Sequence, residues 1–530
     1  MMQAHKIPIF KSWVSEWAAR SVIFAILMSC LFSFAFYSSP ITAIGFYGIQ
    51  PIDVQYGMVV IYGSTVAFLA LDLRIVKYFA PRKYLLIALA VNAICAVICF
   101  HFKDWTWFVI CQFLQGITCA LMSGIVLQLI FPRLHAVRAR VIAYSLLYGS
   151  IQIAVPFYSI FTSMVIYFFD FNWLFYAFII ILLMLIATVL LTMNSKARFT
   201  KKIPLYQVDW IGYLFYLSFI LILGYILVYG RQLGWFGSPL ITTLSVVNLI
   251  ILSLFVLREL KLKRPLINLR IFKTKNFVIG LLLLFMFYIF KGSTGLTYGY
   301  LEVILGNDPL STIPIWIAVI FGTILSMFVT SRFILMGYNL IRIIIVGFGI
   351  MAIYYAYMIL FVSVQGETLH FILPLFIYGV ATGVLFVPIV SFTASSAPTK
   401  IAVNASLVGI LARFTGFTAS LAVNNELQLF AKSEVREKIR ESLTETNSQL
   451  QTTLLDIQNQ YMNAGGDLYT SKAGSTGYFN QMVGHQLLAR ATRGYYDWML
   501  TGVLCVIVIL LLLPKIQNVI LRLRKGNMPY

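Results

Sequence analysis

The stretch that decides the fold runs from Cys111 to Ser163. It reads CQFLQGITCALMSGIVLQLI (111–130), FPRLHAVRAR (131–140) and VIAYSLLYGSIQIAVPFYSIFTS (141–163). Each apolar segment is about twenty residues long, which is the length that a helix needs to cross ~30 Å of hydrocarbon. The basic segment between them is short, so the stretch predicts two antiparallel membrane-spanning helices joined by a tight loop.

Both predicted helices carry small and polar residues at helical spacing. On the first helix they are Gln112, Gly116, Cys119 and Ser123. On the second they are Ser145, Gly149, Gln152, Pro156, Ser159 and Ser163. Such a face points towards protein or a cavity, because a face in contact with lipid favours larger apolar side chains. Close helix packing and a substrate path both explain the pattern, and either places the two helices inside a bundle.

The composition is that of a protein with many membrane spans. Hydrophobic residues make up 60% of the 530 residues and charged residues 11%, which is outside the range of soluble domains. We expect the N-terminal segment to stay as a first helix, because it leads straight into a full-length span. The six cysteines fall inside predicted spans and show no Cys/His spacing typical of a metal site. No metal or other cofactor is therefore expected.

The net charge of +21 indicates orientation in the membrane, and we do not expect a nucleic-acid partner. Basic residues gather in alternate loops, while the intervening short loops carry acidic residues. The basic groups are Arg74, Lys77, Arg82 and Lys83; Arg133, Arg138 and Arg140; Lys196, Arg198, Lys201 and Lys202; and seven residues from Arg258 to Lys275. Because basic loops stay in the cytoplasm, the pattern predicts a multi-pass protein of the inner membrane with both termini cytoplasmic.

The hydropathy pattern predicts fourteen spans and an all-α fold. They lie near 20–42, 54–76, 84–102, 106–131, 141–166, 173–194, 208–229, 239–257, 277–301, 312–332, 340–363, 370–393, 402–425 and 497–515. We divide the chain into a six-helix bundle at 1–200, a central helix pair with a basic linker at 201–275, and a second six-helix bundle at 276–530. The last part includes a polar external segment at 426–496.

Several motifs resemble those of the major facilitator drug exporters. CQFLQGITCA is similar to the fourth-helix signature R-x-x-Q-G-x-x-x-A, with Gln115 and Gly116 matching and Gln112 in the place of Arg. GSIQIAVPFYSI resembles the fifth-helix antiporter signature and keeps its proline as Pro156, and FNWLFYAF resembles the W-R-W-x-F that opens the sixth helix. In the C-terminal half, NASLVGILARFTGFTASLA resembles the eleventh core helix, with Arg413 at the matching arginine.

The central pair and YLEVILGNDPLS, which has Glu302 where the family has Gln, resemble the fourteen-helix drug:proton antiporter branch. The peptide-transporter branch also has fourteen helices, but its first-helix signature E-x-x-E-R-F-x-Y-Y is absent here. The resemblance implies two six-helix halves with the substrate between them near mid-membrane. It further implies export of small amphipathic compounds by proton antiport, a monomer in the lipid bilayer, and a periplasmic membrane-fusion adaptor as partner.

Two basic residues lie well inside predicted spans, where a charge costs at least ~2.5–3.5 kcal/mol. Lys291 shares one helix face with Gly295, Tyr298 and Glu302. We expect Lys291 to face the central cavity, where it attracts an anionic head group or takes part in proton coupling. For Arg413, binding to backbone carbonyls and a place in the cavity are both open.

Proton antiport needs a carboxylate in the membrane, and the first span, FAILMSCLFSFAFYSSP, has none. Glu302 is the first candidate for the proton-coupling site and Asp72 the second, while Asp209 is expected to cap its helix. Arg82 and Lys83 match the basic pair of the family's gating loop, although the residue at the position of that loop's aspartate is Tyr78. Basic residues that merely follow the inside rule also explain this loop.

The external segment contains apolar residues at roughly helical spacing, namely Val435, Ile439, Leu450, Leu454, Ile457 and Tyr461. They predict an amphipathic helix, followed by a turn-rich stretch AGGDLYTSKAGSTGY at 464–478. The apolar face of the helix would pack either on the transporter itself or on a periplasmic partner.

Two other functions are compatible with these residues. Uptake or facilitated diffusion of an anionic metabolite fits the missing carboxylate of the first span. A non-transporting membrane scaffold in an envelope assembly fits the incomplete motifs. An enzyme is not expected, because no nucleophile–base pair or His/Cys/Asp cluster occurs at useful spacing.

Overall fold

The structure is a computed structural model that describes residues 8–75, 78–130, 139–195, 197, 209–262, 264–306, 308–364, 366–398, 402–442 and 447–512. Across these ranges it contains helices and one isolated bridge between Phe10 and Met193, but no β-strand. Fourteen helical segments of the described ranges are long and apolar enough to cross a membrane, which confirms the predicted fold class. The basic loop expected at 131–138 and the residues Lys201 and Lys202 lie outside the described residues.

The first six spans form an N-terminal half. Its first span, α1 (Glu16–Leu31), continues as the 3₁₀ segment η1 (Phe32–Tyr37). The elements that follow are α2 (Pro40–Tyr47), α3 (Pro51–Ile75), α4 (Pro81–His101), α5 (Trp105–Ile130), α6 (Ala139–Phe168) and α7 (Trp173–Thr192). α2, α3 and α4 begin with proline, a position where the missing N–H has no helical partner to lose.

The central pair consists of α8 (Trp210–Tyr229) and α9 (Pro239–Lys261), joined through the 3₁₀ turn η4 (Trp235–Gly237). Asp209 caps α8 as expected, because its side chain accepts a hydrogen bond from the Gly212 N–H at 3.0 Å. Arg258 of α9 also binds Asp209, with Nη2 2.8 Å from Oδ1. α8 packs against both α3 and α15, so the pair lies alongside the two halves.

The last six spans form a C-terminal half. After the short η5 (Leu269–Lys273), its elements are α10 (Lys275–Lys291), α11 (Ser293–Val303), η6 (Pro309–Thr312), α12 (Ile313–Leu335), α13 (Leu340–Phe361), η7 (Thr368–Phe371), α14 (Ile372–Ser396), α15 (Ala402–Ser442), α16 (Ser448–Asn463) and α17 (Leu468–Leu512). The two halves meet along two seams. In one seam α6 packs against α12, and in the other α3 packs against α15.

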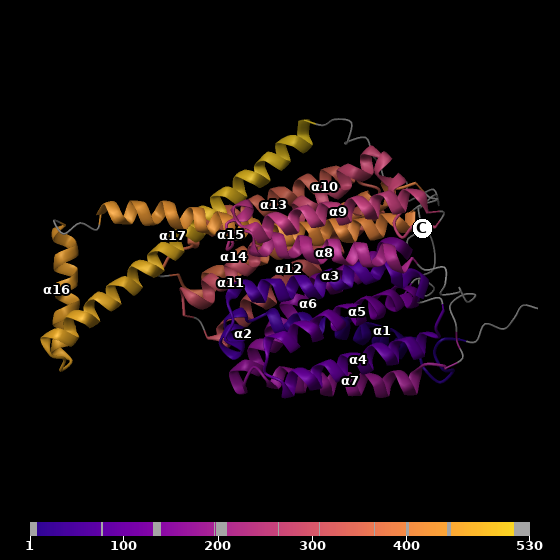
Figure 1. Cartoon of the computed structure of the whole chain (residues 1–530), viewed down its shortest axis with the longest axis horizontal. Helices are drawn as coiled ribbons and strands as arrows, with labels where there is room; N and C mark the ends of the chain where they lie inside the picture. The colour runs from indigo at the N-terminus through magenta and orange to yellow at the C-terminus, as the bar shows by residue number, and fades with distance from the viewer. Residues whose placement is uncertain are drawn as a thin grey trace, which may run out of the picture.

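The described residues of the segment 426–496 project from the bundle up to its end, where Tyr495 and Tyr496 are buried and Tyr496 contacts Tyr354 and Tyr355 of α13. We call the projecting parts of α15 and α17, together with α16, the arm. Figure 1 shows α15 and α17 continuing out of the bundle and α16 joining them at the far end. The 41 residues of α15 would extend about 60 Å at 1.5 Å per residue, twice the thickness of the hydrocarbon core. The arm therefore grows directly out of two membrane helices.

The arm corrects two expectations. The stretch 464–478 is not turn-rich beyond its first residues, because α17 is helical from Leu468 onwards. The predicted amphipathic helix is divided between the end of α15 and α16, and α16 packs on α17. Ile457 is buried there, and the ring of Tyr461 fills the space beside Gly474. The apolar face of α16 thus packs partly within the chain itself, while Leu455, Tyr461 and Met462 remain more than a third exposed.

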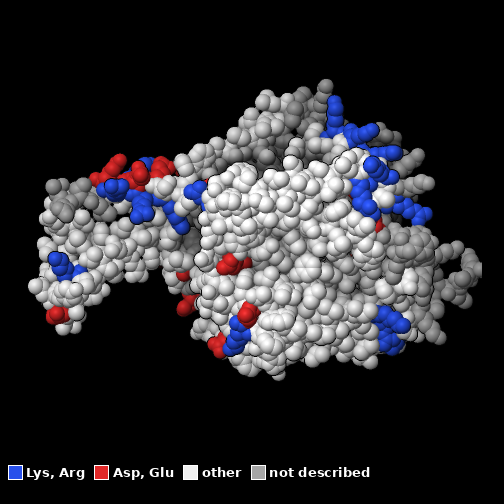
Figure 2. Space-filling model, viewed as in Figure 1, with Lys and Arg blue, Asp and Glu red and all other residues white. Residues whose placement is uncertain are grey.

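The two ends of the bundle differ in charge. Figure 2 shows Lys and Arg side chains gathered at the end opposite the arm, while the arm carries both signs. α4 begins at this basic end with Arg82 and Lys83, and α9 finishes there with Arg258 and Lys261. We refer below to the arm end and the basic end.

Candidate functional site

The seventh core span is interrupted at Gly292. α10 ends at Lys291 and α11 begins at Ser293, so the face expected from Lys291 to Glu302 is divided between two helices. A side chain at position 292 would overlap with Ser420 of α15. Only glycine allows α15 to approach the chain this closely.

The interruption frees backbone carbonyls, and three consecutive ones receive donors from three different helices. The Tyr355 hydroxyl of α13 donates to the Phe290 carbonyl at 2.6 Å. The Tyr378 hydroxyl of α14 donates to the Lys291 carbonyl at 3.0 Å, and the Asn424 amide of α15 donates to the Gly292 carbonyl at 2.9 Å. A buried carbonyl without a partner is costly, so these donors hold the interruption in place.

Lys291 reaches from this interruption across to the other half. Its ammonium group donates a hydrogen bond to the Gln152 side-chain oxygen of α6 and lies 5.5 Å from the centre of the Tyr288 ring. Within the described ranges no carboxylate lies within ion-pair distance of Lys291. The Gln152 amide nitrogen is buried without a hydrogen-bond partner. The contact thus joins a cation of one half to a neutral amide of the other.

Arg413 lies near an aromatic residue that contacts Tyr288. Its guanidinium carbon is 5.7 Å from the centre of the Phe386 ring, and the Phe386 and Tyr288 rings are 6.2 Å apart. Its Nε donates to the Gly409 carbonyl at 3.2 Å, as the carbonyl-binding interpretation expects. Arg413 is 5% exposed and contacts the site through Phe386.

α11 has an open side. A Cβ added at Gly295 or Gly299 would meet no atom within 4 Å. Tyr298 on this short helix stacks on Trp316 of α12, with ring centres 3.5 Å apart, and its buried hydroxyl has no hydrogen-bond partner. At the end of α11, Glu302 accepts a hydrogen bond of 3.4 Å from Ser39, which lies just before α2. Glu302 is therefore a carboxylate at the junction of the halves near the arm end.

The residues expected on α5 and α6 have different environments. Gln112 and Gln115 are 0% and 1% exposed, and none of their side-chain nitrogen and oxygen atoms has a hydrogen-bond partner. Gly116 is a close-packing position, because a Cβ there would overlap with Ser64 and with the Ile61 carbonyl of α3. Pro156 is buried inside α6, one turn beyond Gln152.

Asp72 is 1% exposed within the N-terminal half. It accepts a hydrogen bond from the Tyr84 hydroxyl of α4, and it fills the space beside Gly124 of α5. The structure places it between α3, α4 and α5 of one half, away from the contact between Lys291 and Gln152.

The two residues of the gating-loop resemblance lie at the basic end. The Arg82 guanidinium donates to the Leu190 carbonyl at 3.1 Å, which satisfies a carbonyl in the last turn of α7. Lys83 is exposed. This hydrogen bond of Arg82 is thus made inside the N-terminal half.

Three site residues were missed in the sequence, namely Ser39, Tyr355 and Tyr378, whereas Asn424 was expected on the same helix face as Arg413. Their hydrogen bonds bridge segments far apart in the chain, for which one sequence contains no signal. Gly292, directly after a membrane-embedded lysine, was the available indication of an interruption.

The comparisons with known proteins agree with this architecture. Residues 22–420 match the Major Facilitator Superfamily, and the chain belongs to this family. This is a family of membrane transporters and not of enzymes.

Among relatives, the chain is 22% identical over 332 residues to the multidrug export protein EmrB of Escherichia coli (strain K12), covering 61% of each chain. It is 30% identical over 103 residues to the fatty acid resistance protein FarB of Neisseria gonorrhoeae, covering 18% of this chain and 20% of that one. The chain thus matches about three fifths of the length of EmrB and one fifth of FarB. A solved POT family transporter in complex with 5-aminolevulinic acid has the same fold, with a TM-score of 0.63, 14% identity, and coverage of 97% of this chain and 99% of that one.

Proposed function

We propose that this protein exports acidic amphipathic organic molecules by alternating access. The observation that carries the proposal is the ammonium group of Lys291, which lies at the junction of the halves against a neutral amide and an aromatic ring. A cation inside a membrane protein is expensive without a counter-charge. An anionic head group would supply that charge, and the open side of α11 with Tyr298 and Trp316 would accept its apolar part.

The relatives support this proposal in part. EmrB is by name an exporter, and FarB by name acts in resistance to fatty acids, which are acidic amphiphiles. Gln112 and Gln115 contribute buried amide groups without partners, and Gln152 contributes a buried amide nitrogen without one. We propose that they bind the head group or ordered water on the N-terminal side of the cavity.

For the proton, we propose Glu302 as the coupling site and Asp72 as the alternative. Glu302 is bonded to the N-terminal half through Ser39, so its protonation would change a contact between the halves. Asp72 is enclosed within one half, where a protonation change has no direct effect on the other half. The geometry therefore favours Glu302.

The charge of the two ends supports the proposed orientation. The basic end would face the cytoplasm of a cell with an inner membrane, and the arm would lie in the periplasm. We propose a monomer, divided at 200 and 275 as the hydropathy pattern predicts, with the arm as the contact for a membrane-fusion adaptor.

A second candidate is uptake or facilitated diffusion of an anionic metabolite. The same lysine supports it, because a cation at the junction of the halves binds an anion whichever way the anion moves. The two candidates differ in the proton, which only antiport requires.

The experiment is a transport assay in proteoliposomes with an imposed pH gradient. Decanoate serves as the acidic amphiphile and a quaternary ammonium compound of equal chain length as the cationic one. We expect proton-coupled movement of decanoate. The rate of decanoate transport should fall at least tenfold in Lys291→Met, and proton coupling should be lost in Glu302→Gln.

Matched controls are Lys261→Met, which removes an exposed lysine at the basic end, and Glu437→Gln on the arm. Both should transport like the unmodified protein. Decanoate transport by Lys291→Met at the unmodified rate would contradict the role of Lys291. Decanoate movement without proton flux would favour the second candidate.

A further inference from the structure

Three consecutive residues of α15, Asn424, Asn425 and Glu426, lie where this helix leaves the bundle to form the arm. Each of them bonds to a different part of the molecule. Because successive residues of a helix point in directions about 100° apart, one short segment can contact three neighbours at once.

Asn424 points into the C-terminal half. Its amide nitrogen donates to the carbonyl of Gly292, and its oxygen accepts a hydrogen bond of 2.6 Å from the Tyr495 hydroxyl of α17. Asn424 thus connects both helices of the arm to the interruption that carries Lys291.

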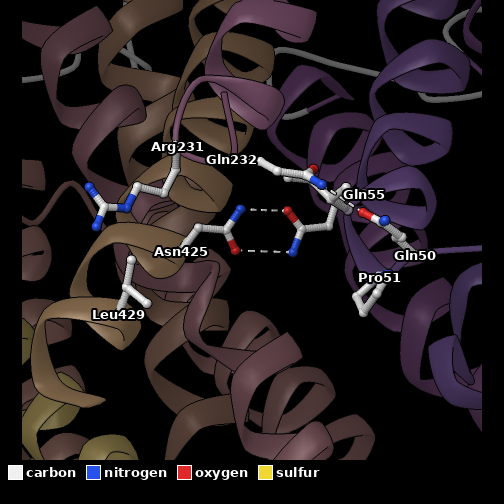
Figure 3. A pocket seen from close by; sticks show the side chains of 8 residues that line it. Gln50, Pro51, Gln55, Arg231, Gln232, Asn425 and Leu429 are labelled. Atoms are coloured by element: carbon white, nitrogen blue, oxygen red, sulfur yellow. Dashed lines mark hydrogen bonds between the residues drawn. The ribbon is translucent and has the colours of Figure 1, made fainter. Parts of the chain in front are cut away.

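Asn425 points to the N-terminal half. Its amide and that of Gln55 in α3 form two reciprocal hydrogen bonds, of 2.9 Å and 3.2 Å. Figure 3 shows the two amide groups facing each other as a closed pair. This pair joins the halves directly at the arm end.

Glu426 points to the central pair. It accepts a hydrogen bond from the Trp235 indole and lies 3.5 Å from Arg231 Nη1, both in the connection between α8 and α9. The neighbouring Gln232 donates to the Gln50 side chain at 2.6 Å, just before α3. The central pair therefore bonds to both halves at the same end.

We propose that Asn424, Asn425 and Glu426 form a gate that holds the arm end closed, with the connection between α8 and α9 as its third component. Opening towards the arm end would separate Asn425 from Gln55. Their hydrogen bonds are neutral, and each contributes little net energy because water replaces it on opening. A pocket of about 290 Å³ beside the pair would let that water in.

The gate also gives the arm a mechanical role. α15 is one continuous helix from the bundle to Ser442, so a displacement of its outer part moves Asn425 and Glu426. This inference rests on alternating access, which is part of the proposed function, but on neither the substrate nor the proton.

The test measures the distance between spin labels at the arm end, without substrate or pH gradient. Labels are attached to Lys103→Cys in the N-terminal half and Glu367→Cys in the C-terminal half, both exposed, in a Cys505→Ser background that removes the exposed native thiol. In the unmodified gate, we expect most molecules to show a short distance between the two labels. The double variant Gln55→Ala/Asn425→Ala should raise the ratio of long to short distances by a factor of roughly 5 to 160, which corresponds to two lost hydrogen bonds.

Three further variants make the result specific. The exchange Gln55→Asn/Asn425→Gln keeps the amide pair and should restore the short distance. The variant Gln55→Glu/Asn425→Asp places like charges together and should open the gate further. The control Asn459→Ala/Gln460→Ala removes two exposed amides of α16 and should change nothing. An unchanged distance in both the alanine pair and the acidic pair would overturn the gate, whether or not the transport assay succeeds.

Discussion

The interiors of the two halves share close helix packing, but the C-terminal half adds hydrogen bonds to an interrupted helix. In the N-terminal half, α3 and α5 approach until Gly116 lies directly against Ser64, and Gly124 against Asp72. In the C-terminal half, hydroxyl and amide groups bind the carbonyls of an interrupted helix, with Tyr355 as the most enclosed of the three donors. Close packing is present in the C-terminal half as well, because α12 and α14 approach each other through Gly322, Gly379 and Gly383. What distinguishes the C-terminal half is the set of hydrogen bonds to its interrupted helix.

This difference indicates where the molecule can change shape. Helices in close backbone contact resist small displacements, because overlapping atoms repel steeply. Hydrogen bonds to freed carbonyls can be exchanged for others or for water. We therefore expect the C-terminal half to rearrange around Gly292 more readily than at the closely packed contacts of either half.

The largest effect is expected from Gly116→Ala. Its Cβ would overlap with the Ile61 carbonyl and with Ser64, and a backbone group cannot turn away. Overpacking of this kind costs about 1–3 kcal/mol, occasionally more, so thermal unfolding in detergent should shift clearly downwards. Gly299→Ala is the control, since its Cβ meets no atom within 4 Å. Equal stability of the two variants would contradict close packing in the N-terminal half.

The second largest effect on stability is expected from removing a hydrogen bond in the C-terminal half. Tyr355→Phe leaves the buried carbonyl of Phe290 without this donor, which should cost about 1–3 kcal/mol of unfolding free energy. Tyr298→Phe removes a hydroxyl that has no partner and should cost nothing measurable. A melting curve of Tyr355→Phe that matches that of Tyr298→Phe would show that the interruption does not depend on this donor.

The third substitution is expected to raise the stability of the fold, whereas the first two lower it. Gln115→Leu replaces a fully buried amide without a partner by an apolar side chain of similar size. Because an unpaired buried amide is destabilising by about 1–3 kcal/mol, the variant should unfold at a higher temperature. The measurement pairs melting with decanoate transport. A lower melting temperature would mean that Gln115 is bonded to water in the folded protein.

The smallest effect is expected at the tip of the arm. The side chain of Asp467 accepts hydrogen bonds from the Thr470 hydroxyl and N–H, which lower the pKa of this carboxyl. A lowered pKa stabilises the fold above the unfolded value of about 4, and the contribution is lost as the pH falls through the lower, folded value. Asp467→Ala should therefore speed hydrogen exchange only in the first turn of α17 at neutral pH. An unchanged rate of hydrogen exchange in this turn would contradict the capping role of Asp467. Asp456→Ala within α16 is the control.

The residues of the candidate site could be predicted only in part. Lys291 and Glu302 stand out in the sequence because charges are rare in spans. The face that was expected to join them is divided between two helices, and the sequence could not show this because the hydroxyl and amide donors that stabilise the interruption come from other helices. The turn-rich stretch at 464–478 was wrong for a related reason. Its glycines and polar residues are helical in α17, which packs against α16.

What the sequence by itself determined is the number of spans, their order and the basic end, because each depends on a local property. Hydrocarbon demands about twenty apolar residues for every crossing, and basic loops remain on one side. Only the tertiary structure decided that Lys291 meets Gln152, that Asn425 meets Gln55, and that α15 and α17 continue into an arm. These features depend on which segments become neighbours, and the energy of such contacts arises only when residues far apart in the chain are brought together.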